Sequence, residues 1–255
     1  MSIIVESYAR SVIATGSLVA TKPLGVSDND WLCIPIGRDD NVINVTLPSG
    51  WNLVSSIAEV LEASGDDRSM LIAVKKIVDA GSEPVDYTFT WSGDSSEPSV
   101  GSIFRFSGVD ATTFEDVAYV EVTHYATQNS SDAPNAVAIT TNTNAAVVLI
   151  FASGTRSIST TDPDLSGASV PAGYSGIGGI TGAGYDDSGT GSRDVLWLCA
   201  IKEVTTAGVE TPAPWTGLTN ALNDFSVMTI AIKPAVAPGG GVLPVIAHHR
   251  QLNFS

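Results

Sequence analysis

Apolar and polar residues alternate most regularly over residues 86–92, where Tyr87, Phe89 and Trp91 lie on one face of an extended segment and polar residues lie on the other. This period of two predicts a half-buried strand. A loop rich in Gly, Ser, Asp and Pro follows, and residues 103–107 then predict a second strand with two aromatic side chains on one face. Two aromatic faces joined by such a loop predict the nucleus of a β-sandwich.

Similar patterns predict about eleven short strands along the chain. No predicted helices alternate with these strands, which argues against a parallel α/β fold. Two segments that are apolar on both faces, residues 31–36 and 145–152, are predicted to lie centrally in sheets. Residues 52–63 fit either a helix or a strand by their spacing, and we favour a strand that enters a loop. The other predicted strands are residues 12–20, 42–47, 70–78, 117–123, 136–141, 195–203 and 225–233.

The predicted fold is all-β: a two-sheet antiparallel β-sandwich, jelly-roll-like, over residues 12–234. Residues 1–11 are predicted to form an N-terminal arm or an edge strand. Residues 154–194 form a long insertion rich in Gly, Ser and Asp, with one weak hairpin predicted at residues 174–180, and insertions of this kind are usually functional or mobile. A flexible hinge and a C-terminal arm are predicted over residues 235–255.

The composition limits the classes of partner. Hydrophobic residues make up 44% of the 255 residues and charged residues only 15%, so uncharged polar residues must cover much of the surface. The net charge of −15 argues against nucleic-acid binding through a broad basic face. No run approaches the ~20 apolar residues of a membrane helix, and Glu6 and Arg10 interrupt the apolar N-terminal stretch, which makes it a poor secretory signal. We therefore expect neither a nucleic-acid nor a membrane partner.

The two cysteines, Cys33 and Cys199, each end a Trp-Leu-Cys sequence within a predicted buried strand. Cysteine packs well there as a small apolar residue, so we predict two reduced thiols in the core. A disulfide between neighbouring strands is the alternative. No histidine or second cysteine lies near either residue in the sequence, so metal binding at the cysteines is not expected.

The sequence shows no catalytic arrangement. Its only histidines are His124, His248 and His249, and no Gly-x-Ser-x-Gly sequence occurs. Acidic residues gather in loops rich in Gly and Ser, where they read as solvated turn residues, with calcium binding as an alternative that lacks an EF-hand spacing. These acidic residues are Asp66, Asp67, Asp162, Asp164, Asp186 and Asp187, and calcium is the alternative only for the last four. We predict a protein that is not an enzyme and has no cofactor and no metal.

Trp215 is the best candidate for contact with a glycan. It lies in a loop between Pro214 and Thr216, whereas the other four tryptophans fall in strand patterns and read as core residues. An exposed tryptophan can stack on a sugar ring. The alternative is that Trp215 packs its own loop against the core.

The C-terminal residues differ from the rest of the acidic chain. An apolar segment, residues 242–246, precedes a mildly basic segment that ends close to an aromatic residue. One interpretation is a disordered terminus, and the other is an arm that docks on another subunit with Leu252 and Phe254 as anchors. The predicted contact residues are Val242, Leu243, Val245, Ile246, His248, His249, Arg250, Leu252 and Phe254.

Several groups of residues share their order and spacing with a known family. They are Pro23 with residues 30–32 (Asp-Trp-Leu), residues 45–54 (Val-Thr-Leu-Pro-Ser-Gly-Trp-Asn-Leu-Val), 72–76 (Ile-Ala-Val-Lys-Lys), 87–91 (Tyr-Thr-Phe-Thr-Trp), 106–110 (Phe-Ser-Gly-Val-Asp) and 229–234 (Thr-Ile-Ala-Ile-Lys-Pro). Together, over residues 12–234, they resemble the β-sandwich virion proteins of tailed bacteriophages, found as capsid decoration proteins and in tail or fibre assemblies. The insertion and the His-His-Arg tail depart from that pattern.

The resemblance implies a structural protein of the virion surface, made in the host cytoplasm. The leading expectation is a protein that decorates or cements the capsid through non-covalent contacts with the major capsid protein or with neighbouring copies of itself, as a homotrimer on the particle. One alternative is a tail or fibre component, or a lectin-like module, that binds glycans of the host surface. A second alternative is a carbohydrate-active enzyme on a jelly-roll scaffold.

Overall fold

The structure is a computed structural model, and it describes residues 3–10, 16–38, 44–59, 68–92, 99–125, 134–156, 169–176, 183–186, 194–217 and 224–236. Within these ranges the chain forms sixteen strands and no helix, and every strand pair is antiparallel. The prediction of an all-β antiparallel fold is confirmed, whereas the jelly-roll order of strands stays a prediction. In the described part no helix is long and apolar enough to cross a membrane.

The strands have the following bounds. In chain order they are β1 (Ile4–Arg10), β2 (Ser17–Thr21), β3 (Trp31–Arg38), β4 (Val45–Thr46), β5 (Asn52–Glu59), β6 (Arg68–Lys76), β7 (Asp86–Trp91), β8 (Ser99–Ser107), β9 (Glu115–Tyr125), β10 (Ile139–Thr141), β11 (Ala146–Arg156), β12 (Ser175–Gly176), β13 (Ala183–Asp186), β14 (Asp194–Val204), β15 (Gly208–Glu210) and β16 (Asp224–Ile232).

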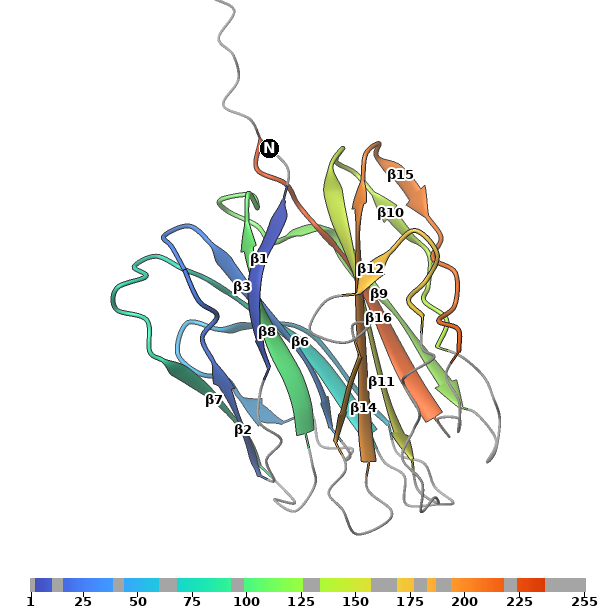
Figure 1. Ribbon diagram of the computed structural model, residues 1–255, viewed down its shortest axis with the longest axis horizontal. Helices are drawn as coiled ribbons and strands as arrows, with labels where there is room; N and C mark the ends of the chain where they lie inside the picture. The colour runs from blue at the N-terminus through green and yellow to red at the C-terminus, as the bar shows by residue number, and fades with distance from the viewer. Residues whose placement is uncertain are drawn as a thin grey trace, which may run out of the picture.

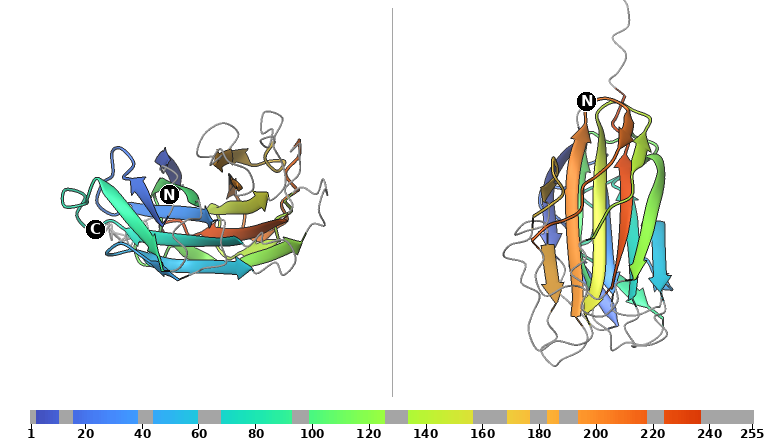
Figure 2. Two further views of the ribbon diagram at one scale, coloured as in Figure 1. Left: turned by 90° about the horizontal axis from the view of Figure 1, so that it is seen from below. Right: turned by 90° about the vertical axis from the view of Figure 1, so that its right-hand side faces the viewer.

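The sheets form four layers (Figures 1 and 2). Two large sheets pack face to face at the centre, one with the order β1-β8-β3-β6-β5 and one with the order β12-β14-β11-β16-β9, in which β13 also pairs with β14. The three-stranded sheet β2-β7-β4 covers the outer face of the first large sheet, and the β10-β15 pair lies over the outer face of the second. The predicted sandwich is therefore the central pair, and the two outer layers were not predicted.

Three apolar cores separate these layers. In β3, Trp31 and Cys33 face the second large sheet, while Leu32 and Ile34 face the β2-β7-β4 layer. β11 likewise divides its side chains between the central core and the core beneath β10-β15. Because alternate residues of a strand point to opposite faces, a strand buried on both faces reads as a continuous apolar run. The central positions predicted for these two segments are confirmed.

The predicted sandwich nucleus requires correction. Tyr87, Phe89 and Trp91 share one buried face of β7, as the alternation predicts, but β7 pairs with β2 and β4 and not with β8. Phe104 and Phe106 point into the central core, on the opposite side of their sheet from the β7 aromatics. The two aromatic faces therefore belong to different cores, because a loop between two strands does not decide whether they pair.

Short strands account for most of the remaining differences. Of the strand predicted over residues 12–20, residues 12–15 lie outside the described residues, and the described part forms β2 from Ser17. β12 pairs with β14, and residues 177–180 of the predicted hairpin lie outside the described residues. β13 and β15 were not predicted, because strands of only a few residues lack a clear period.

The two halves of the chain have the same topology. Adding eight to each label converts the order β1-β8-β3-β6 into β9-β16-β11-β14, and the outer pair β2-β7 into β10-β15. The fifth position, β5, is shared in the second half by β12 and β13. The register agrees as well, since Trp31 lies opposite Lys76 and Phe106 just as Val147 lies opposite Glu203 and Ile232. Position 147 in β11 is therefore equivalent to position 31 in β3.

Equivalent backbone contacts support the duplication. Asn29 and Ala145 both have positive φ angles, +70° and +60°. The N–H of each donates to a carbonyl at the end of the equivalent strand: Asn29 to Ile77 at 2.9 Å, and Ala145 to Val204 at 2.8 Å. The chain thus contains two copies of one folding unit, packed together through the central core.

The two units come into close contact where β3 meets β11. A Cβ atom on Gly37 would lie 2.2 Å from Oγ of Ser153, and positions 37 and 153 are equivalent in the two units. Contact between equivalent positions is expected on an axis of approximate twofold symmetry. Near this point Trp197 donates its indole N–H to the Pro35 carbonyl at 3.2 Å, which joins the two large sheets.

Candidate functional site

A buried cluster of three side chains joins β6 to β7. Nζ of Lys75 lies 2.7 Å from Oε2 of Glu83, and the Tyr87 hydroxyl donates to the same oxygen at 2.7 Å. The ammonium also lies 5.2 Å from the centre of the Tyr87 ring. Burial raises the pKa of Tyr87, and the hydrogen bond to Glu83 raises it further. This tyrosine therefore stays protonated at neutral pH, where it serves as a hydrogen-bond donor and not as a base.

The second unit contains a matching cluster. Nζ of Lys202 lies 2.6 Å from Oε1 of Glu210, the Tyr174 hydroxyl donates to Glu210 at 3.2 Å, and Lys202 lies 5.5 Å from the Tyr174 ring. Burial, followed by the charge of Glu210, raises the pKa of Tyr174. Lysine and glutamate occupy equivalent positions in the two units, whereas the tyrosine comes from a different segment in each. Both clusters hold strands and turns together and are unsuited to proton transfer.

Each lysine lies beneath a tight turn that ends in an aromatic residue. In residues 48–51 the N–H of Trp51 donates to the Pro48 carbonyl at 3.2 Å, and Gly50 has a φ of +81°. Residues 171–174 repeat this turn, with a bond of 3.0 Å and a φ of +82° at Gly173. Glycine adopts such angles without strain, which explains the shared Pro-x-Gly-aromatic sequence.

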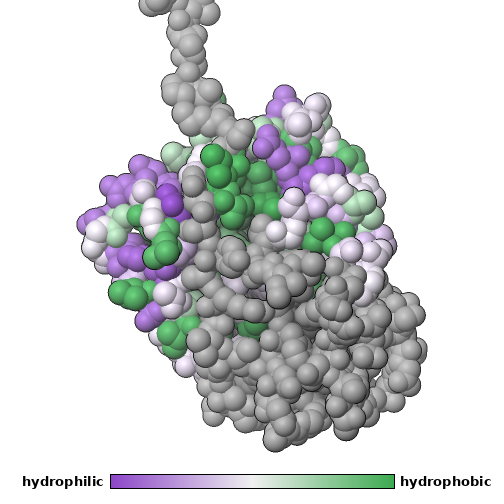
Figure 3. Space-filling model, viewed as in Figure 1, coloured by the Kyte–Doolittle hydropathy of each residue, from purple (hydrophilic) through white to green (hydrophobic). Residues whose placement is uncertain are grey.

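A groove lies between β1 of the first unit and β12 and β14 of the second. Its volume is about 340 Å³, which falls within the range of about 300–1,000 Å³ typical of ligand pockets. Both apolar side chains and polar groups line the groove. The lining residues are Ile3, Val5, Val147, Gly173, Ser175, Ile201, Lys202 and Glu203. Figure 3 shows apolar residues gathered on this face of the molecule.

The groove reflects a difference between the two units. At the position of Val147, the first unit has Trp31, whose indole packs 5.5 Å from the Phe114 ring and donates its N–H to the Asp110 carbonyl at 3.0 Å. Trp31 is only 7% exposed, so it fills the corresponding space in the other unit. Valine at position 147 is much smaller, and the space beside β1 stays open.

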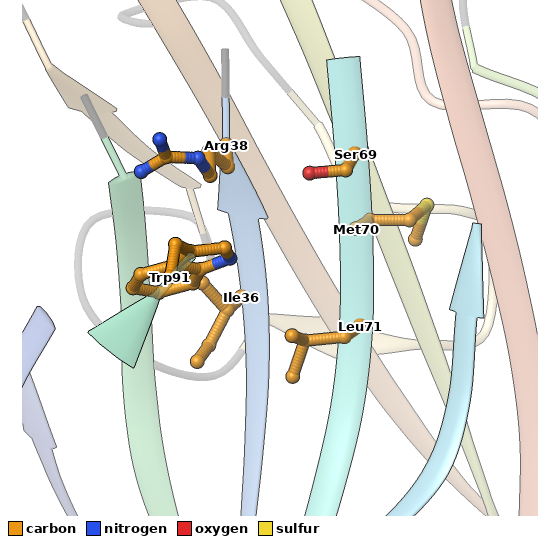
Figure 4. Close-up of a pocket in the computed structure, with 6 residues that line it drawn as sticks. All are labelled: Ile36, Arg38, Ser69, Met70, Leu71 and Trp91. Carbon is orange, nitrogen blue, oxygen red and sulfur yellow. The ribbon is translucent and has the colours of Figure 1, made fainter. Parts of the chain in front are cut away.

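A second concave site, drawn in Figure 4, is a packing feature. Arg38, which is 1% exposed, lies with its guanidinium carbon 5.0 Å from the centre of the Trp91 ring. Ile36 and Leu71 point to the same side of their sheet, whereas the Met70 side chain points away from the pair. The space between these side chains is too small for a water molecule. The site therefore has no room for a ligand.

The structure corrects the prediction for Trp215. Its side chain is 1% exposed and packs in the core between the second large sheet and its covering layer. The backbone N–H of Trp215 donates to the Pro134 carbonyl at 3.1 Å, which ties the loop to the preceding segment. Burying the large apolar indole is favourable, so the side chain packs into the core even though it lies in a proline-rich loop. The alternative interpretation, that Trp215 packs its loop against the core, is what the structure shows.

The cysteine prediction is confirmed. Cys33 and Cys199 are both free thiols, fully buried in the central core. Burial raises the pKa of both thiols, with smaller contributions from Glu115 at Cys33 and from Cys33 at Cys199. A thiol that stays protonated and buried is chemically inert, so these residues serve as small apolar core residues.

The other predicted site residues are not brought together by the described structure. The nine residues of the C-terminal arm lie outside the described ranges, as do all the candidate calcium ligands except Asp186, which ends β13. His124 lies in β9 opposite Phe225. Among the described residues, no three or more histidine, cysteine or acidic side chains gather in a way that could hold a metal ion.

Comparison of the chain with protein family models, curated proteins and solved structures finds no match in any of the three. Its function must therefore be argued from its own residues. The fold and the groove together define a duplicated β-sheet protein in which the two units differ, among other features, in what fills the space beside each edge strand.

Sequence reasoning missed the groove, although the sequence holds a signal for the duplication behind it. Pro-x-Gly-aromatic occurs at residues 48–51 and 171–174, and each is followed by Ala-x-Lys and then by Glu at the eighth position after that lysine. These features alone do not align Trp31 with Val147, because the spacing between the strands differs in the two units; that equivalence comes from the strand registers of the structure. The Trp-Leu-Cys repeat points elsewhere, because Cys33 lies in β3 and Cys199 in β14, which are not equivalent strands.

Proposed function

We propose that this chain is a non-enzymatic structural protein of the surface of a tailed-phage virion, where it decorates or cements the capsid. The observation that carries the proposal is that the residues which resemble the phage virion proteins make structural contacts in this fold. Asp30 pairs with Arg105 at 2.6 Å, Lys75 and Tyr87 bind Glu83, and Gly50 forms the turn above Lys75. The motifs thus secure sheets and turns, as expected of a protein whose role is to present a stable surface.

The proposed partners are the major capsid protein and neighbouring copies of the same chain. We propose a homotrimer on the particle, because identical subunits most often close into symmetric rings. The C-terminal arm, with its apolar residues 242–246 followed by a basic segment, is the proposed subunit contact. Its positive groups complement a chain with a net charge of −15.

Locating the protein on purified particles tests the proposal. Heads and tails are separated, and the copy number of this chain in each is measured by quantitative mass spectrometry and by particle reconstruction. The proposal expects many copies on heads, arranged around symmetry axes. Its absence from heads, or its presence only on tails at low copy number, would contradict a decorating role.

Binding to host glycans is a weaker candidate on this structure. All five tryptophans are at most 7% exposed, and the large hydrophobic side chains exposed among the described residues are aliphatic. Stacking on a sugar ring needs an exposed aromatic face. A glycan array probed with the isolated protein checks this candidate, and selective binding there would favour the tail or fibre role.

A further inference from the structure

The groove lies between two exposed sheet edges. β1 pairs only with β8, and β12 pairs only with β14, so within the described residues each has one edge without a partner strand. Edges of this kind accept extended segments through backbone hydrogen bonds. Ile3, Val5 and Ile201 supply apolar side chains beside these edges. The groove is therefore suited to an extended apolar peptide.

The described chain ends next to this groove. The N–H of Ala235 donates to the Gly108 carbonyl at 2.8 Å, and Ile4 of β1 pairs with Ser107, the residue before Gly108. Figures 1 and 2 show that the described chain comes to its end beside the start of β1. Val236, the last described residue, is 76% exposed. Whatever follows it begins at the edge of the groove.

The sequence after Val236 has the length and chemistry to return to the groove. Residues 237–241, Ala-Pro-Gly-Gly-Gly, can span up to about 17 Å when extended, at about 3.3–3.6 Å per residue. Three consecutive glycines permit a reversal of direction. Residues 242–246, Val-Leu-Pro-Val-Ile, are wholly apolar and would be costly to leave in water.

We propose that residues 242–246 bind in the groove of their own chain, as an extended segment alongside β1. Binding buries their apolar side chains against Val5, Val147 and Ile201. His248, His249 and Arg250 then follow at the end that carries the exposed Glu203. A tethered segment binds with a high effective concentration, which favours its own groove over that of another molecule in dilute solution.

This inference does not rest on the virion role. It does provide a route to the proposed subunit contact, because the groove of a neighbouring copy is chemically identical. Exchange of the same segment between neighbours is a low-cost way to link identical subunits. The groove would then hold the arm before assembly and receive a neighbour's arm on the particle.

Hydrogen exchange on the isolated full chain tests the proposal. We expect the amides of residues 242–246, Pro244 excepted, to exchange at least about tenfold more slowly than in a free peptide of the same sequence. Val147→Trp, which copies the first unit and fills the groove, should abolish this protection. Val209→Trp is the matched control, since Val209 is 72% exposed and lies in β15 away from the groove. Exchange at the free-peptide rate in the wild-type chain overturns the proposal.

A second measurement covers the case in which Val147→Trp fails to fold. Leu243→Asp changes the proposed segment instead of the groove, and it should also remove the protection. Ser255→Asp, which adds the same charge outside the segment, should retain it. Oxidation of the double variant Ser175→Cys, Leu243→Cys at low concentration should give a crosslinked monomer. A crosslinked dimer would overturn binding to the chain's own groove and assign the segment to a neighbour. No crosslink under conditions that oxidise exposed thiols would also count against the proposal.

Discussion

The first unit, β1 to β8, and the second unit, β9 to β16, reach the same strand order with different side chains at most equivalent positions. They keep the glycine turn, the lysine–glutamate pair and a central strand buried on both faces. They differ beside the edge strand, where Trp31 fills the space in one unit and Val147 leaves a groove in the other. The comparison teaches that the strand order, the glycine turn and the lysine–glutamate pair are retained while the side chains between the sheets differ and leave a groove in one unit.

Replacing Trp31 should have the largest effect, because it removes the side chain that closes the first unit. Trp31→Val makes this position match Val147, and we expect it to lower the free energy of unfolding by about 2–4 kcal/mol through loss of buried surface and creation of a cavity. Urea unfolding measures the change. Trp31→Phe is the control, since it keeps an aromatic ring and so more of the packed volume than valine does, and it removes the hydrogen bond to Asp110. An equal loss for both variants would mean that the hydrogen bond matters more than the volume.

The contact at the approximate twofold axis provides the next test. Gly37→Ala places a methyl group against Ser153 and should cost about 1–3 kcal/mol, because buried strands cannot separate without loss of packing. Adding Ser153→Gly removes the opposing side chain and should restore most of the stability. Chemical denaturation of the single and double variants measures this coupling. If Gly37→Ala is as stable as the wild type, the two central strands do not meet as closely as described.

The two lysine–glutamate pairs should differ in strength because they differ in burial. The side chains of Lys75 and Glu83 are 11% and 9% exposed, whereas those of Lys202 and Glu210 are 32% and 13% exposed. We expect Glu83→Gln to cost about 1–3 kcal/mol, because it leaves a buried ammonium with a weaker partner. Glu210→Gln should cost less than about 1 kcal/mol, since water and salt screen that pair more.

Unfolding experiments at low and high salt check both values. Only the Glu210→Gln difference should shrink clearly as salt increases. Equal losses in the free energy of unfolding for the two variants would show that the difference in burial does not make one ion pair stronger than the other.

Particular residues show which parts of the fold could be predicted from the sequence. The alternation at Tyr87, Phe89 and Trp91 predicted both the strand and its buried face, because the period of two is a local property. Pairing is not local: nothing around β7 or β8 indicates that they belong to different sheets. Trp215 was misplaced for the same reason, since its burial depends on strands far away in the sequence.

The groove could not be predicted from local sequence patterns. It arises from one small residue, Val147, at a position whose partner in the other unit is large, and only the alignment of the two units reveals the contrast. The arm was predicted from its hinge, its apolar segment and its basic residues, and its place is a proposal. A local sequence pattern does not predict features that depend on two segments far apart in the chain.

A last and smaller difference between the units concerns charge beside the edge strands. Val5 in β1 lies opposite Phe106, and Glu115 in β9 lies opposite Ile232, so the two positions are equivalent. Burial raises the pKa of Glu115 above its ordinary value of 4.5. The charged form is therefore less favourable in the folded protein than in the unfolded chain, and an ionised Glu115 lowers stability at neutral pH.

Glu115→Gln should accordingly raise the melting temperature slightly at neutral pH. The sign follows from linkage: as the pH falls through the raised pKa, the wild-type carboxyl becomes protonated in the folded state and the penalty disappears. Below about pH 4.5, where the unfolded chain is protonated too, the two proteins should melt alike. Thermal melts of both proteins across this range measure the effect. A difference that persists unchanged in acid would mean that the substitution acts through packing and not through charge.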